Sequence, residues 1–141
     1  MKNQVPVSTI MSKNVIVLNL SDDLTKAESL FKKNHIRHIP VVNSNKIVGM
    51  LSYTDLLRIS FVDAADDDEE VVDVTVYNMF TVEQVMAKKL TTVSPDTTIR
   101  EVAEILSKKE FHALPVVHGQ LLVGIVTTTD IIKYLLSQYK E

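Results

Sequence analysis

The feature that most constrains this chain is an internal repeat with an offset of 75 residues. Met11 falls on Met86, Pro40 on Pro115 and Gly49 on Gly124, and no gap is needed from Met11 to Lys133. Between these identities, apolar residues fall on apolar residues. A register this long does not arise by chance, so the chain is two copies of one structural unit.

Each copy predicts the same order of elements. A short β-favouring stretch precedes a helix with apolar residues at helical spacing, and two apolar runs around a polar turn then predict a hairpin before a closing helix. The strand-like stretches are Val15 to Leu18, His38 to Val42 and Lys46 to Ser52, then Thr91 to Val93, Ala113 to Val117 and Leu121 to Thr127. The predicted class is α/β (α+β), with two β-α-β-β-α repeats.

The predicted helices have their own start signals and apolar faces. Asp23 and Thr98 are suited to N-capping, and Thr98 with Glu101 has the spacing of a capping box. In the closing helices the apolar residues are Leu56, Leu57 and Phe61, and then Ile131, Ile132, Leu135, Leu136 and Tyr139. Their helical spacing predicts one apolar stripe on each closing helix.

The repeat also divides the chain into a first copy at 1–62, a linker at 63–79 and a second copy at 80–141. One unit of this size has little core, so we expect the copies to pack together with pseudo-two-fold symmetry. The run 63–70 is mostly acidic but lacks the spacing of an EF-hand, which favours a solvated linker over a Ca²⁺ or Mg²⁺ site. The apolar residues at 71–80 are a candidate partner surface.

Composition excludes several function classes. A net charge of −3 gives no basic surface for nucleic acid, and the absence of cysteine excludes disulfides and zinc thiolate sites. The start lacks the apolar core of a signal peptide, and no apolar run is long enough to span a membrane. We therefore expect a cytoplasmic protein with no nucleic-acid or membrane partner.

Each hairpin ends in the pattern Gly-x-x-[Ser/Thr]-x-Thr-Asp, within HIRHIPVVNSNKIVGMLSYTD and EFHALPVVHGQLLVGIVTTTD. A carboxylate can accept hydrogen bonds from both ribose hydroxyls, while a hydroxyl and the N–H groups of a helix N-terminus can hold a phosphate. These two strings resemble the cystathionine-β-synthase (CBS) domain, a regulatory module that binds adenine nucleotides. The resemblance covers nearly the whole chain, twice and in register.

The resemblance implies a role for each matching position. Asp55 and Asp130 would bind ribose, with Ser52 and Thr127 beside the phosphate and Thr54 and Thr129 in the same loops. Val17 and Ile39 in the first copy, and Thr92 and Leu114 in the second, would lie near the adenine. The phosphate needs a cation, for which Arg37 and His112 are the aligned candidates; since Arg37 is always charged, we expect the first site to tolerate more phosphate charge.

Structural explanations remain open for the same residues. Thr54-Asp55 and Thr129-Asp130 also suit the start of a helix, where capping and the helix dipole are each worth about 0.3 to 1 kcal/mol. The four histidines, His35, His38, His112 and His118, lack the spacing of metal ligands. No nucleophile elbow, Walker loop or dinucleotide fingerprint is present, so we predict no enzyme activity and no cofactor.

The leading hypothesis is a regulatory CBS pair that binds AMP, ADP, ATP or S-adenosylmethionine between its copies and signals to an effector protein. CBS pairs commonly dimerise, so a homodimer is expected through the closing helices. One alternative is a ligand-free dimerisation or interaction module whose aspartates serve only as caps. A weaker alternative is a metal-regulated sensor that uses the acidic linker.

Overall fold

The computed structural model describes residues 4–62, 77–109 and 111–139. The chain forms two compact units. The first-repeat unit is Ile16–Leu90, and the second-repeat unit joins Met1–Val15 to Thr91–Glu141. The acidic run at 63–70, with its predicted linker role and its candidate metal site, lies outside the described residues.

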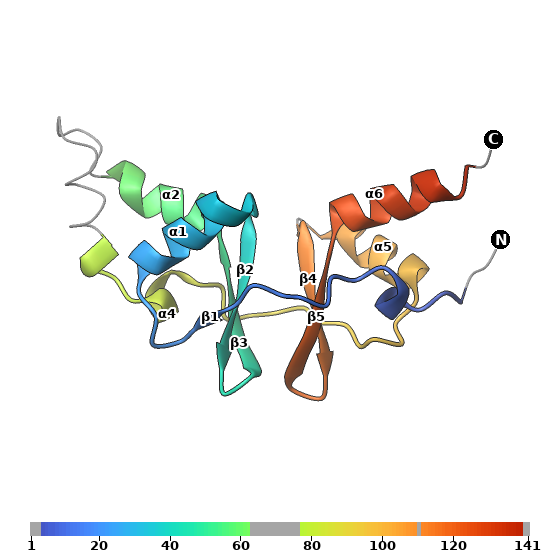
Figure 1. Cartoon of the computed structure of the whole chain (residues 1–141), viewed down its shortest axis with the longest axis horizontal. Coiled ribbons are helices and arrows are strands. Elements are labelled where there is room, and N and C mark those ends of the chain that lie inside the picture. The colour runs from blue at the N-terminus through green and yellow to red at the C-terminus, as the bar shows by residue number, and fades with distance from the viewer. Residues whose placement is uncertain (1–3, 63–76, 110, 140–141) are drawn as a thin grey trace. The chain divides into compact units, whose positions relative to one another are not determined.

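In the first-repeat unit, β1 (Leu18–Asn19) pairs in parallel with β2 (His38–Asn43), and β2 pairs antiparallel with β3 (Lys46–Ser52). The hairpin and the two helices of the β-α-β-β-α prediction are confirmed (Figure 1). The elements are β1 (Leu18–Asn19), α1 (Leu24–Asn34), β2 (His38–Asn43), β3 (Lys46–Ser52), α2 (Tyr53–Val62) and α4 (Val82–Val85).

The second-repeat unit repeats the order of helix, hairpin and closing helix, with β4 (Ala113–His118) antiparallel to β5 (Leu121–Thr127). Its elements are η1 (Val7–Thr9), α5 (Ile99–Lys108), β4 (Ala113–His118), β5 (Leu121–Thr127) and α6 (Thr128–Ser137). Together the two units confirm the mixed helix and strand class.

The predicted first strands are wrong in extent. In the first repeat the strand is Leu18–Asn19 rather than Val15 to Leu18, and it ends where the Asp22 carboxylate accepts the N–H of Asn19. In the second repeat only Val93 pairs, through a single parallel bridge to Val116. A turn closed by a hydrogen bond from Thr97 to Ser94 follows Val93 at once and stops the strand.

Helices α1 and α5 begin directly after the predicted N-cap residues, Asp23 and Thr98. Asp23 precedes α1 and its carboxylate accepts the N–H of Lys26 at 2.8 Å. The predicted capping box of Thr98 and Glu101 is present at the start of α5. Each cap satisfies backbone N–H groups that have no partner inside the helix.

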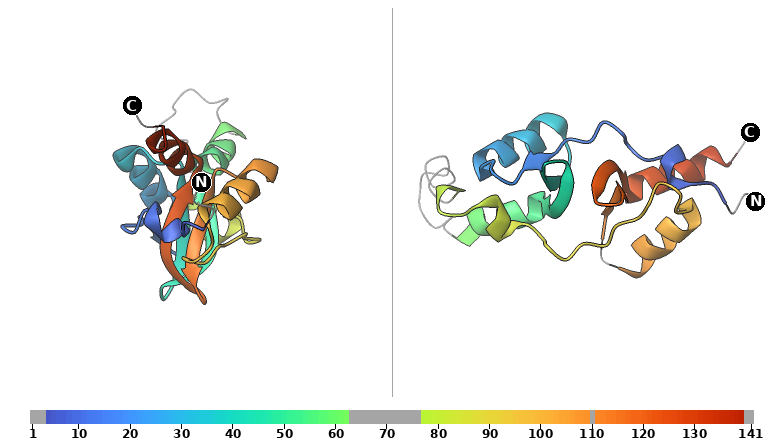
Figure 2. Two further views of the ribbon diagram at one scale, coloured as in Figure 1. Left: turned by 90° about the vertical axis from the view of Figure 1, so that its right-hand side faces the viewer. Right: turned by 90° about the horizontal axis from the view of Figure 1, so that it is seen from below.

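The first residues of each copy pack in the unit of the other repeat. Val7 and Val82 are equivalent by the 75-residue offset, yet Val7 is buried with the core of the second repeat and Val82 with that of the first. Ser12 exchanges backbone hydrogen bonds with Ile125, and Ala87 does so with Met50. Figure 2 shows the blue N-terminal segment running with the orange and red elements, and the yellow segment with the cyan and green ones.

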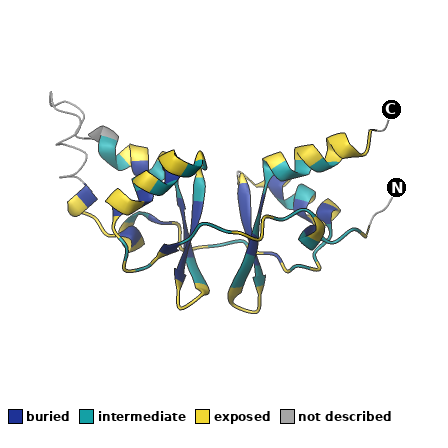
Figure 3. Ribbon diagram, in the orientation of Figure 1, coloured by how far each residue is buried: buried dark blue, intermediate teal, exposed yellow. Residues whose placement is uncertain are grey.

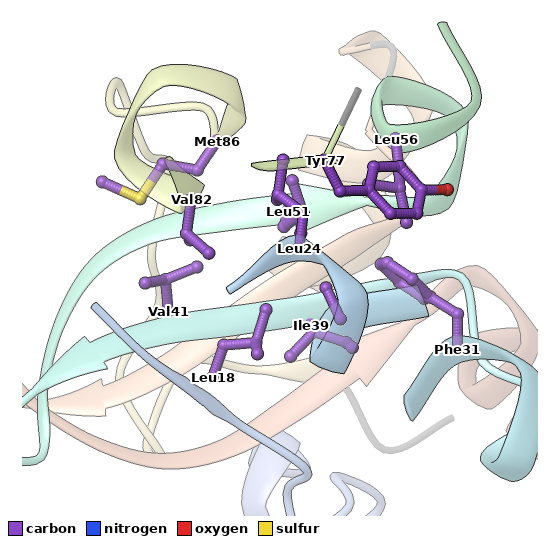
Figure 4. Close-up of a cluster of buried hydrophobic side chains, with 11 residues drawn as sticks. Leu18, Leu24, Phe31, Ile39, Val41, Leu51, Leu56, Tyr77, Val82 and Met86 are labelled. Carbon is purple, nitrogen blue, oxygen red and sulfur yellow. The ribbon is translucent and has the colours of Figure 1, made fainter. Parts of the chain in front are cut away.

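Each unit has its own hydrophobic core. In the first-repeat unit, residues from α1, the three strands and α2 meet Tyr77, Val82 and Met86 (Figure 4). In the second-repeat unit, Val7 joins residues of α5, β4 and β5. Burial follows the strands and the inner faces of the helices, while the outer helix faces and hairpin tips are exposed (Figure 3).

Candidate functional site

The candidate site residues gather at two equivalent junctions, one between β3 and α2 and one between β5 and α6. At the first junction, Ser52 ends β3 and its hydroxyl accepts the N–H of Asp55 at 3.0 Å. The next residue, Tyr53, donates its N–H to the carbonyl of Arg37 at 2.8 Å. These bonds bring Arg37, Ser52, Thr54 and Asp55 to one end of the hairpin.

The second junction has the same backbone connection and a tighter cap. Thr128 donates its N–H to the carbonyl of His112 at 3.0 Å, as Tyr53 does to Arg37. The hydroxyl of Thr127 accepts the N–H of Asp130 at 3.1 Å, and the carboxylate of Asp130 accepts the N–H of Thr127 at 2.9 Å. This reciprocal pair is a complete capping box.

The two aspartates are therefore held by different partners. Oδ1 of Asp55 lies 3.1 Å from Nη1 of Arg58 one turn along α2, whereas Oδ2 of Asp130 accepts a backbone N–H. Within the described residues, the second oxygen of each carboxylate accepts no hydrogen bond. Both aspartates are half-buried in the first turns of their helices.

Arg58 was missed by sequence reasoning. The signal that could have found it is its position three residues after Asp55, because side chains at that spacing are neighbours on a helix. The equivalent residue of the second repeat is Lys133. Lys133 is exposed and forms no ion pair with any residue that the structure describes.

The other predicted residues lie nearby on the chain but differ in burial. Thr54 and Thr129 are exposed in the first turns of α2 and α6. Ile39 is 0% exposed in the core of the first unit, and Leu114 is 1% exposed in that of the second. Their side chains pack inward, so the predicted contact with adenine would have to use their backbone or follow a rearrangement.

The remaining four predicted residues lie on the surface or at its edge. Val17 is half-buried just before β1, and Thr92 is exposed just before the bridge residue Val93. Arg37 and His112 are both exposed beside their junctions. Each junction thus has a hydroxyl, a carboxylate and a cationic or titratable side chain close to one helix start.

The chemistry of such a junction suits a sugar phosphate. The first N–H groups of a helix and a nearby hydroxyl donate to phosphate oxygens, and a carboxylate accepts from vicinal hydroxyls. Both helices have ten residues, which is long enough for a substantial dipole. No metal is needed for this chemistry, and no cluster of three or more metal-ligating side chains occurs among the described residues.

An open depression of about 500 Å³ lies elsewhere in the first-repeat unit. It is lined by Asn19, Leu20, Ser21, Val42, Asn43 and Ser44. These residues are at the end of β2 away from Arg37, so the depression contains none of the predicted site residues.

In the described part of the chain, no helix is both long and apolar enough to cross a membrane.

Comparison with known proteins identifies the repeat. The model of the CBS domain matches twice, at residues 7–61 and 82–137. Protein MJ1404 of Methanocaldococcus jannaschii is 33% identical over 135 residues, which cover 92% of this chain and 31% of that protein. The chain spans only 46% of a second relative, MJ1225 of the same organism.

Solved structures show the same fold. The CBS domain pair of protein MJ0100, in complex with 5′-methylthioadenosine and S-adenosyl-L-methionine, superposes with a TM-score of 0.79 at 26% identity, over 96% of this chain and 98% of that one. CBSX2 in complex with AMP superposes with a TM-score of 0.82 at 22% identity, over 96% and 99%. With both repeats matched and their fold reproduced, this chain belongs to the CBS domain family.

Proposed function

We propose that this chain is a regulatory CBS pair that binds an adenosine-type ligand through Asp55 and Asp130 and transmits its occupancy to a partner protein. One observation carries the proposal: each repeat places an aspartate, a hydroxyl and the start of a ten-residue helix at the same junction. A capping box uses only one oxygen of a carboxylate, and the second oxygen of each aspartate accepts no hydrogen bond from a described residue.

The role of each junction follows from hydrogen-bonding chemistry. Asp55 and Asp130 accept hydrogen bonds from the ribose hydroxyls, and Ser52 and Thr127 lie on the side of the phosphate together with the helix N–H groups. Arg37 and His112 supply the nearby cationic or titratable groups, and Val17 and Thr92 flank the base. The MJ0100 pair, with its two bound adenosyl compounds, supports this ligand class.

The regulatory role rests on linkage. A ligand that contacts both repeats stabilises the arrangement that it binds best, and its preference between arrangements sets how far the population shifts. The chain would therefore act as a sensor rather than as an enzyme. Its partners would be the nucleotide, a second copy of the chain and an effector protein.

Binding is tested by isothermal titration calorimetry with AMP, ADP, ATP, S-adenosylmethionine and 5′-methylthioadenosine. We expect at least one to bind, and Asp55→Asn or Asp130→Asn to weaken binding at the affected site by about tenfold or more, since charge-assisted hydrogen bonds are lost. Heat release that is zero for all five ligands would contradict the proposal.

Matched controls separate binding from folding. Glu101 forms the same capping box with Thr98 in the second-repeat unit, so Glu101→Gln removes a carboxylate charge from an equivalent cap away from the junction. Asp22 accepts a backbone N–H and pairs with Lys26 at 3.2 Å in the first-repeat unit, so Asp22→Asn is the control for Asp55. Both controls should bind ligand as the unaltered protein does.

A second candidate function is a ligand-free dimerisation module. It is favoured by the fact that both aspartates already have partners in their own chain, Arg58 for Asp55 and the N–H of Thr127 for Asp130. This function predicts a dimer whose melting temperature does not respond to any adenosine compound. The calorimetric experiment above therefore decides between the two.

A further inference from the structure

We propose that Arg58 makes the Asp55 site selective for a ligand with a 5′-phosphate, a selectivity that the Asp130 site lacks. This inference rests on the proposed function and extends it to a residue outside the repeated motif. It starts from one asymmetry: the carboxylate of Asp55 is paired with a guanidinium at 3.1 Å, while that of Asp130 is paired with a neutral backbone N–H.

The asymmetry changes the charge that each site presents. At Asp55 the formal charges of carboxylate and guanidinium cancel, so a phosphate approaching the start of α2 meets no net repulsion. At Asp130 the carboxylate has no cationic partner among the described residues, and its negative charge opposes a phosphate held nearby. Repulsion between two negative charges held close together costs binding free energy, and a neutral or cationic 5′ substituent avoids that cost.

Arg58 is also free to respond to a ligand. Its side chain is 71% exposed and that of Asp55 is 28% exposed, so their ion pair costs little to rearrange. When ribose hydroxyls donate to Asp55, they replace the hydrogen bond from Arg58. The guanidinium then has donors available for the 5′-phosphate, and Arg geometry suits bidentate contact with phosphate. The phosphate is carried on C5′, which is bonded to the ring carbon beside the one that bears the 3′ hydroxyl.

The position of Arg58 on α2 allows this exchange. Helical side chains lean toward the N-terminus, so a residue three positions after Asp55 brings its charge back over the first turn. Lys133 has the equivalent position on α6, but it is a point charge without an ion pair to Asp130 in the described residues. It serves as the natural control.

The test compares two ligands that share adenosine and differ at the 5′ position, AMP with its phosphate and 5′-methylthioadenosine without it. Calorimetry on the full chain should show that Arg58→Gln weakens AMP binding by about fivefold to tenfold or more, while 5′-methylthioadenosine changes by less than about twofold. Arg58→Lys should retain part of the preference, and Lys133→Gln should leave both affinities unchanged. Added salt should weaken AMP binding in the unaltered protein more than in Arg58→Gln.

The outcomes are distinguishable. An equal loss for both ligands in Arg58→Gln, or no loss for AMP, overturns the role of Arg58 while leaving the proposed function intact. Failure of the unaltered protein to bind any adenosine compound overturns both. Because Arg58 is exposed, a melting temperature close to that of the unaltered protein is expected for Arg58→Gln and confirms that folding is preserved.

Discussion

The hydroxyl of Tyr77 donates a 2.7 Å hydrogen bond to a carboxylate oxygen of Glu28, a residue 49 positions earlier on α1. Ser60 of α2 also places its hydroxyl 3.1 Å from the Tyr77 oxygen. Tyr77 is 2% exposed and belongs to the core of the first-repeat unit. Tyr77, which lies before α4, is therefore tied to both α1 and α2.

Removal of this hydroxyl should destabilise the first-repeat unit. We expect Tyr77→Phe to lower the free energy of unfolding by about 1 to 2 kcal/mol, because a hydrogen bond to a charged acceptor is lost. Urea denaturation measures the change. Tyr53→Phe is the control, since the Tyr53 ring packs against Phe31 with centroids 5.2 Å apart and its hydroxyl has no hydrogen bond to a described residue. A loss as large for Tyr53→Phe as for Tyr77→Phe would contradict the role of the bond.

The second repeat has no equivalent of this network. By the repeat offset, Glu28 corresponds to Ala103 and Ser60 to Leu135, and neither side chain can form such hydrogen bonds. Sequence comparison of the copies reveals this difference, but it cannot show that Tyr77 reaches both helices. That contact depends on where the end of the predicted linker, which includes Tyr77, packs.

A second prediction concerns Gly49, which lies against Met86 near the start of the second copy. A Cβ on Gly49 would overlap the side chain of Met86 in the first-repeat unit. We expect Gly49→Ala to destabilise this unit by about 1 to 3 kcal/mol through overpacking. The double variant Gly49→Ala with Met86→Ala should recover part of the loss in urea denaturation, and additive losses would exclude the contact as the cause.

The same substitution in the other unit should be harder to rescue. A Cβ on Gly124 would lie 2.6 Å from Sδ of Met11 and 3.0 Å from the backbone oxygen of Ser12. The methionine can move aside, but the backbone of Ser12 is held by its paired hydrogen bonds to Ile125. We therefore expect that adding Gly124→Ala to the Met11→Ala variant lowers the free energy of unfolding. Adding Gly49→Ala to the Met86→Ala variant should lower it by less.

Sequence reasoning predicted the fold better than the details of the site. The repeat, the capping box at Thr98 and the hairpins follow from local patterns, and the structure confirms them. The exchange of Val7 and Val82 between units could not be predicted, because apolar residues of equal size fit either core. The site roles of Asp55 and Asp130 stay predictions, and the structure adds that each carboxylate has a different partner.

The two hairpin turns give a third, reciprocal prediction. Ser44 and Asn45 form the first turn with φ angles of 53° and 69°, whereas in the second turn only Gly119 has a positive φ, of 65°. Side chains are strained in this region and glycine is not. Ser44→Gly should raise the free energy of unfolding by up to about 1 kcal/mol, and Gly119→Ser at the equivalent position should lower it by a similar amount. Shifts of the same sign for both variants would contradict this explanation.

The closing helix of the second repeat gives the last prediction, a homodimer. On α6, Ile132, Leu135 and Leu136 recur at helical spacing and are 51%, 53% and 62% exposed. Tyr139, which was expected on the same stripe, lies just beyond the end of the helix at Ser137 and is 72% exposed. A contiguous apolar face of this kind is typical of an interaction surface. We expect the protein to sediment as a dimer in analytical ultracentrifugation.

Leu136→Glu should raise the dissociation constant of that dimer about a hundredfold or more, because an unpaired carboxylate would be buried in the contact. Ser137→Glu adds the same charge to the other side of α6 and should leave the dimer intact, since Ser137 is exposed and its hydroxyl bonds only to near neighbours, the carbonyl of Tyr134 and the side-chain amide of Gln138. Equal dissociation by both variants would indicate a general effect of charge. If the unaltered protein is a monomer at all concentrations, the homodimer prediction is wrong. The apolar stripe would then be too weak to hold two copies together, and this face would be exposed or would bind a different protein.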